Sequence, residues 1–130
     1  MKPAAVDANV LVRLATGDSA DEYQAAIDSL AARVWRVFPT VILETEWVLR
    51  SRYQFTPARF AEFVEWMDAS GRVAFSDADT VRAAVSYHRA GLDFADALHL
   101  AQAGGDAFLT FDKALRRRAV KLGLRAKAVE

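Results

Sequence analysis

The sequence predicts an α/β fold: a three-layer sandwich in which a mostly parallel central sheet of four or five short strands is flanked by helices. Short β-like runs alternate with longer segments whose apolar residues have helical spacing. Strands separated by helices need crossover connections, which make neighbouring strands parallel. The chain has 130 residues and neither an internal repeat nor a low-complexity linker. We therefore expect one domain over residues 1–130.

The first two helices are bounded by clear stop and start signals. An apolar run at residues 3–6 ends at Asp7 and is the first expected strand. The helix that follows should stop at Gly17, because glycine accepts the left-handed conformation of a helix end. Ser19 and Glu22 form a capping box for a helix over 19–30.

Strands and helices continue to alternate in the middle of the chain. A second strand is expected at 35–38, and a helix then runs from about 40 to 52. Thr56 followed by Pro57 is typical of a helix start, and Gly71 ends that helix. The third strand is expected at 72–76.

The last part of the chain predicts three more helices and one or two strands. Asp77 is expected to cap a helix that ends at Gly91, and Asp93 to begin a helix that Gly104 closes. Residues 107–111 are the fourth expected strand, and Asp112 opens the last helix. A final strand is possible at 124–129.

Composition narrows the classes of function. The chain has no cysteine, which excludes disulfides, thiolate nucleophiles and zinc–thiolate sites. No apolar run approaches the roughly 20 residues that cross a bilayer, and the N-terminal segment does not resemble a signal peptide. We expect a cytoplasmic protein without a membrane partner. The charges of seventeen basic and seventeen acidic residues cancel, but seven of the basic residues lie within the last eighteen positions, 113–130.

Acidic residues follow the expected strands and helix starts. Asp7 and Asp112 each stand between a strand and a helix, where the carboxyl ends of parallel strands place ligand sites. Both also have a structural explanation, since aspartate is a favoured N-cap. Asp93 shares that explanation, and Asp96 suits the first turn of a helix. Each residue alone is explained by capping as well as by catalysis.

Glu44 has no such local explanation. Its neighbours one helical turn away are Thr40, Val41, Trp47 and Val48, none of them basic. Glu46 has Arg50 four residues later, which favours a helical ion pair. We therefore expect Glu46 to be a surface charge. Glu44, on a flank bordered by apolar residues, needs a cation or a solvated cleft.

A divalent cation would relieve the repulsion among these acids. Asp93 and Asp96 share one helical face at i,i+3, and His99 could partly offset Asp96. Carboxylate ligands without cysteine or a paired histidine motif suit Mg²⁺ or Mn²⁺ rather than Zn²⁺. The sequence thus predicts a magnesium site.

Four short motifs follow one another along the chain: Asp7-Ala8-Asn9 after an apolar strand, Leu43-Glu44 before Trp47-Val48-Leu49, Asp93-Phe94-Ala95-Asp96-Ala97-Leu98-His99-Leu100-Ala101, and Leu109-Thr110-Phe111-Asp112. Together they resemble the PIN-domain family, and more narrowly its VapC-like toxins. Each motif alone is unspecific, but their order at this chain length is specific. The resemblance covers nearly the whole chain and favours Glu44 over Glu46 as the second acid.

The resemblance implies a metal-dependent endoribonuclease that is the toxin of a toxin–antitoxin pair. Asp7, Glu44, Asp96 and Asp112 match the acids that surround one or two Mg²⁺ or Mn²⁺ ions. Asn9 and Thr110 match supporting positions, and Asp93 matches a neighbour that is frequently acidic. The implied partners are an RNA substrate, a cognate antitoxin and a second copy in a homodimer.

Two other classes of function stay open on the sequence alone. A HAD-like phosphatase also begins with a strand that leads into an aspartate, but it needs a second aspartate two residues later, where Asn9 stands. A non-catalytic PIN relative that binds RNA or a partner need not keep all four carboxylates.

Overall fold

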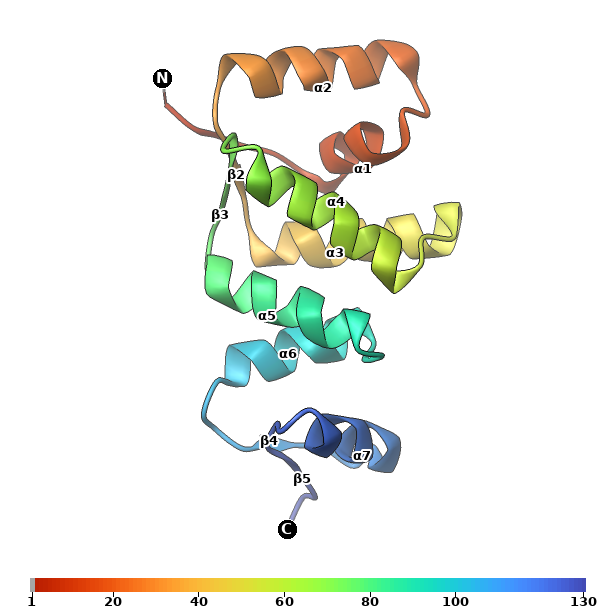
Figure 1. Ribbon diagram of the computed structural model, residues 1–130, viewed down its shortest axis with the longest axis vertical. Coiled ribbons are helices and arrows are strands. Elements are labelled where there is room, and N and C mark those ends of the chain that lie inside the picture. The colour runs from red at the N-terminus through yellow and green to blue at the C-terminus, as the bar shows by residue number, and fades with distance from the viewer. Residues whose placement is uncertain (1) are drawn as a thin grey trace. The chain divides into compact units, whose positions relative to one another are not determined.

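The computed structural model describes residues 2–130, which divide into two compact units. Unit 1 ends at Ala78, and unit 2 comprises Asp79–Glu130. Figure 1 colours the chain from red in unit 1 to blue in unit 2. Each unit has its own buried residues and its own sheet.

Unit 1 is built around a three-stranded parallel sheet in the order β1-β2-β3. Its elements are β1 (Ala4–Ala5), α1 (Ala8–Thr16), α2 (Ala20–Ala32), β2 (Trp35–Val37), α3 (Pro39–Tyr53), α4 (Pro57–Ala69) and β3 (Val73–Phe75). Trp35 pairs with Ala4 on one side and with Val73 on the other. Consecutive strands are joined through helices, as parallel pairing requires.

The centre of unit 1 is apolar and follows the period of two of a strand. Trp35 and Val37 are fully buried, whereas Arg36 between them is exposed. Helix α1 packs against both α2 and α3 and buries Leu11 and Leu14. This packing holds the start of α1, and with it Asp7, directly after β1.

The predicted end of α1 and the predicted starts of α2 and α4 are confirmed by their caps. Gly17 ends α1 with φ 63°, and its backbone N–H donates to the Arg13 carbonyl. The Ser19 hydroxyl accepts a hydrogen bond from the Glu22 backbone N–H (3.3 Å), as expected of a helix N-cap. Thr56 caps α4 in the same way, with Pro57 in its first turn.

Unit 2 contains three helices and a two-stranded parallel sheet within its described residues. Its elements are α5 (Ala78–Arg89, which begins at the unit boundary), α6 (Phe94–Ala103), β4 (Phe108–Leu109), α7 (Lys113–Lys121) and β5 (Ala126–Lys127). Phe108 pairs with Ala126, and α7 packs on β5. Phe94 is fully buried in α6.

The structure confirms the α/β class and the parallel pairing, with two departures in detail. The five short strands are divided between a three-stranded and a two-stranded sheet instead of forming one sheet. Asp77 was expected to cap α5, but its φ of 54° is left-handed rather than the extended conformation of an N-cap. None of the helices over residues 2–130 is long and apolar enough to cross a membrane.

Candidate active site

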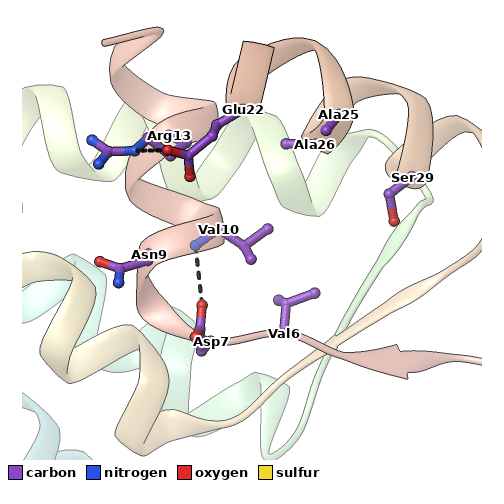
Figure 2. Close-up of a pocket in the computed structure, with 9 residues that line it drawn as sticks. All are labelled: Val6, Asp7, Asn9, Val10, Arg13, Glu22, Ala25, Ala26 and Ser29. Carbon is purple, nitrogen blue, oxygen red and sulfur yellow. Dashed lines mark hydrogen bonds and ion pairs between the residues drawn. The ribbon is translucent and has the colours of Figure 1, made fainter. Parts of the chain in front are cut away.

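Asp7 lies at the turn from β1 into α1 and is the N-cap of that helix. Its Oδ1 accepts a hydrogen bond from the Val10 backbone N–H (3.2 Å), which Figure 2 shows as a dashed line. The bond occupies one carboxylate oxygen on an exposed side chain. Capping therefore explains the position of Asp7 and leaves the second oxygen for another role.

A pocket of about 410 Å³ opens beside Asp7 in unit 1. Its walls are residues of α1, of α2 and of the segment that joins β1 to α1: Val6, Asp7, Asn9, Val10, Arg13, Glu22, Ala25, Ala26 and Ser29 (Figure 2). Farther along α1, Arg13 Nε lies 3.5 Å from Oε1 of Glu22, a residue of α2. Most of the lining is apolar side chain, so Asp7 lies at the border of a largely apolar recess.

Helix α3 reverses the expected environments of its two glutamates. Glu46 is 3% exposed and is among the buried residues of α3 with Ile42, Thr45 and Leu49, whereas Glu44 is exposed. The prediction of an ion pair with Arg50 is confirmed, since Arg50 Nε donates to Glu46 Oε2 at 2.9 Å.

The prediction that Glu46 is a surface charge is wrong. Residues 42, 45, 46 and 49 share one helical face, and that face is the buried one. The apolar neighbours of Glu44 lie on the other side: Trp47 is 54% exposed, and Val41 and Val48 are only partly buried. Glu44 is consequently a solvated carboxylate, and no burial cost has to be offset there.

Asp112 is the second carboxylate that both caps a helix and follows a strand. Its Oδ1 accepts a hydrogen bond from the Leu115 backbone N–H (3.0 Å) at the start of α7. The Thr110 hydroxyl accepts from the Asp112 backbone N–H (3.1 Å) and so holds the turn that presents this carboxylate. The supporting position predicted for Thr110 thus has a specific contact.

Arg116 braces the same turn, a contact that the sequence reasoning missed. Its Nη1 donates to the Thr110 backbone carbonyl at 2.7 Å. The sequence showed Arg116 only as one member of a basic run. Arg116 stands four residues after Asp112, the N-cap of α7. This spacing could have predicted the contact, because side chains on a helix lean toward its N-terminus.

Asp96 is the acid whose surroundings are the most unfavourable for its charge. Partial burial raises the pKa of its carboxyl above the ordinary 3.8, and the negative charges of Asp93 and Asp112 raise it further. His99 acts in the opposite direction, as the sequence predicted, but does not prevail. The His99 ring also stacks on Phe108, with 6.3 Å between ring centroids.

Asp93 occupies the N-cap position of α6 without a capping hydrogen bond from its side chain. Its carboxylate is exposed and acts on Asp96 through its charge. The capping explanation that suits Asp7 and Asp112 therefore does not account for the Asp93 side chain. Unit 2 brings Asp93 and Asp112 within electrostatic reach of Asp96.

The donor set fits a hard divalent cation in its chemistry. The acids of unit 2 offer oxygen ligands, and a Mg²⁺ ion would relieve the repulsion that Asp93 and Asp112 exert on Asp96. Asp7 and Glu44 are carboxylates of unit 1. Within residues 2–130, no group of three or more histidine, aspartate or glutamate side chains is arranged to hold an ion by itself.

Comparison with known protein families identifies the class of protein. The family model described as the PIN domain matches residues 4–121 and so spans Asp7, Glu44, Asp96 and Asp112. The chain belongs to the PIN domain family. PIN domains are typically metal-dependent nucleases. Neither the comparison with curated proteins nor the one with solved structures returned a significant match.

Proposed function

We propose that this protein is a Mg²⁺-dependent endoribonuclease whose single PIN domain, residues 1–130, comprises both units. The observation that carries the proposal is the placement of Asp96, partly buried and close to the negative charges of Asp93 and Asp112, in a chain that belongs to a nuclease family. The family match runs without interruption across the boundary between the units, which supports treating them as one domain.

In this proposal Asp7 and Asp96 are the main ligands of Mg²⁺, and Mn²⁺ can substitute. An ion held there would lower the pKa of an attacking water and polarise the scissile phosphate. Glu44 and Asp112 orient that water and accept its proton, or hold a second ion. The exposure of Glu44 and Asp112 supports this role, because both carboxylates are open to solvent and substrate.

The supporting residues fix the acids in place. Thr110 holds the backbone of Asp112 through its hydroxyl, and we assign Asn9 a comparable supporting role beside Asp7. Asp93 adds negative charge next to Asp96. In-line attack by water leaves a 5′-phosphate and a 3′-hydroxyl, and it needs no chemistry at the 2′-hydroxyl of the RNA.

We further propose that the protein is the toxin of a VapBC-type pair, that it acts in the cytoplasm as a homodimer, and that a cognate antitoxin silences it. The motif resemblance is the main support. Phe38 (41% exposed), Trp47 (54%) and Trp66 (50%) are large rings open to solvent, and an antitoxin or a second copy would bury apolar area by covering them.

Cleavage of an end-labelled RNA in Mg²⁺ tests the nuclease proposal. Wild-type protein should cut the RNA, EDTA should stop the reaction, and the products should carry 5′-phosphates. Asp7→Asn keeps the shape and a capping oxygen while it removes a ligand charge. Glu62→Gln, on the exposed face of α4, is the matched control and should cut at the wild-type rate. Full activity of Asp7→Asn would contradict the assignment, and binding of RNA without cleavage would favour a non-catalytic relative.

Controlled expression tests the toxin role. Wild-type protein should arrest growth of its host, Asp7→Asn should not, and co-expression of a short neighbouring reading frame that encodes a DNA-binding protein should restore growth. If the host continues to grow although the purified protein cuts RNA, the toxin role is contradicted and the nuclease proposal is not.

A further inference from the structure

The C-terminal segment carries a concentration of positive charge that the neutral net charge conceals. Residues 1–112 contain ten basic and sixteen acidic side chains, whereas residues 113–130 contain seven basic and one acidic. The chain is thus divided into a part of net charge −6 and a part of net charge +6. The basic residues are Lys113, Arg116, Arg117, Arg118, Lys121, Arg125 and Lys127.

These charges are not neutralised within the protein. Over residues 2–130, no ion pair joins any of the seven to a carboxylate. The two with hydrogen-bond partners donate to backbone carbonyls, Arg116 to Thr110 and Arg125 to Gly105. Arg116 is partly buried and the other six are exposed. A surface that only needed solubility would be expected to mix both signs of charge.

The geometry of α7 gathers part of this charge on one face. Lys113, Arg117 and Lys121 follow one another at i,i+4, so their Cα atoms rise along the helix in steps of about 6 Å. A hollow of about 610 Å³ is lined by residues of α7 and of the segment around β5 in unit 2. Helix α7 packs on β5, near the C-terminus in Figure 1. Four of the hollow's eight lining residues are cationic, and the full set comprises Arg116, Arg117, Val120, Lys121, Ala126, Lys127, Ala128 and Glu130.

An exposed aromatic ring lies at the start of the same helix. Phe111 is 81% exposed, and it directly precedes Asp112, the N-cap of α7. Arg116 contacts the carbonyl of Thr110 on the other side of Phe111 and so rigidifies the turn that carries the ring. Exposing a whole phenyl ring has a free-energy cost that a stacking partner would recover.

We propose that Phe111 and the basic face of α7 and β5, defined here by Arg117, Lys121 and Lys127, bind single-stranded RNA. The three cationic side chains bind phosphates of the RNA backbone, and the ring of Phe111 stacks on one base. This combination of a cationic groove and an exposed aromatic is how proteins hold single strands without reading their sequence. The inference rests on the proposed ribonuclease function and identifies where the substrate enters beside Asp112.

The test measures binding separately from cleavage. Fluorescence anisotropy of a short labelled oligouridylate is recorded with the full chain in EDTA, at salt concentrations between about 50 and 200 mM. Wild-type protein should bind, with an affinity that falls as salt rises. Arg117→Gln/Lys121→Gln should bind more weakly and should lower the slope of log affinity against log salt by about 1.4, or 0.7 for each lost phosphate contact.

Two matched variants make the result specific. Arg33→Gln/Arg52→Gln removes two exposed cations of unit 1 and should leave the slope unchanged. Phe111→Ala should weaken binding by about ten-fold, the size of one lost base–aromatic stack, without altering the slope. Circular dichroism of each variant checks that the fold is retained.

The outcomes separate this inference from the proposed function. An unchanged affinity and slope in Arg117→Gln/Lys121→Gln would overturn the inference even if the protein cuts RNA. The expected changes would support it even if no cleavage is found. A shift in the sedimentation of that variant with no change in RNA binding would overturn it in favour of an interface between two copies.

Discussion

Arg50 Nε donates a hydrogen bond of 2.9 Å to Glu46 Oε2, and this contact joins a half-exposed side chain to one that is almost fully buried. A buried carboxylate is costly unless a cation or hydrogen-bond donors accompany it. The pair therefore explains how α3 can carry a glutamate on its inner face. It also means that the inner glutamate of α3 has a structural role, while Glu44 on the outer side is open to solvent.

Removing the inner carboxylate should destabilise the protein. Glu46→Ala leaves Arg50 without its helical partner and opens space on the buried face of α3, so we expect the free energy of unfolding to fall by about 2 kcal/mol. Urea denaturation followed by circular dichroism measures the loss. Glu62→Ala, at an exposed position of α4, should change stability by about 0.5 kcal/mol or less. Equal stabilities of the two variants would contradict the structural role of Glu46.

Catalysis should depend on the outer glutamate instead. Glu44→Gln should reduce RNA cleavage by about 100-fold or more, because it removes a group that orients or deprotonates water. Its free energy of unfolding should stay close to that of the wild type, since the side chain is exposed. A stable Glu46→Gln variant that loses cleavage, together with an active Glu44→Gln, would transfer the catalytic role to Glu46.

The two roles of Asp112 can be separated by two substitutions. Asp112→Asn keeps an oxygen that can cap α7, so stability should change by only a few tenths of a kcal/mol. Asp112→Ala removes the cap and should lower the free energy of unfolding by about 1 kcal/mol. Both variants should lose cleavage. An Asp112→Asn protein that cuts RNA at the wild-type rate would leave capping as the only role of this residue.

Asp96 should make stability depend on pH in the metal-free protein. Because its pKa is raised in the folded state, the folded protein holds this proton to higher pH than the unfolded chain does. Its contribution is therefore most favourable at low pH, and it is lost as pH rises from the ordinary value of 3.8 through the raised pKa of the folded state. At neutral pH the ionised carboxylate destabilises the fold.

Asp96→Asn tests that sign. At pH 7 in EDTA its Tm should exceed that of the wild type by about 2–4 °C, which corresponds to roughly 1 kcal/mol or less for a partly solvent-screened group. The difference should shrink as pH falls toward the ordinary value. Mg²⁺ should raise the Tm of the wild type, since a ligand stabilises the state that binds it, and should raise that of Asp96→Asn less. A lower Tm of the variant in EDTA would contradict the repulsion described for unit 2.

Local signals predicted most of the helices and their ends. Ser19, Gly17 and the Thr56-Pro57 pair act within a few residues of themselves, so their effect can be read without knowledge of the fold. Asp77 was the exception, because its left-handed backbone belongs to the junction between β3 and α5 and not to a cap. The hydrophobic pattern also could not predict that the strands divide into two sheets. Periodicity identifies strands but does not show which strands pair.

The sequence by itself determined the α/β class, the family, and the acids to consider, because strand and helix periods, caps and motif order are written in neighbouring residues. Only the tertiary structure decided which face of α3 is buried. Helical spacing shows that Ile42, Glu46 and Leu49 share a side, but the packing of α1 against α3 and the rest of the fold determine which side meets protein. The same holds for Asp96, whose pKa is raised by burial and by Asp112, sixteen residues away along the chain. Burial and through-space charge depend on how distant segments fold together, and no local pattern contains that information.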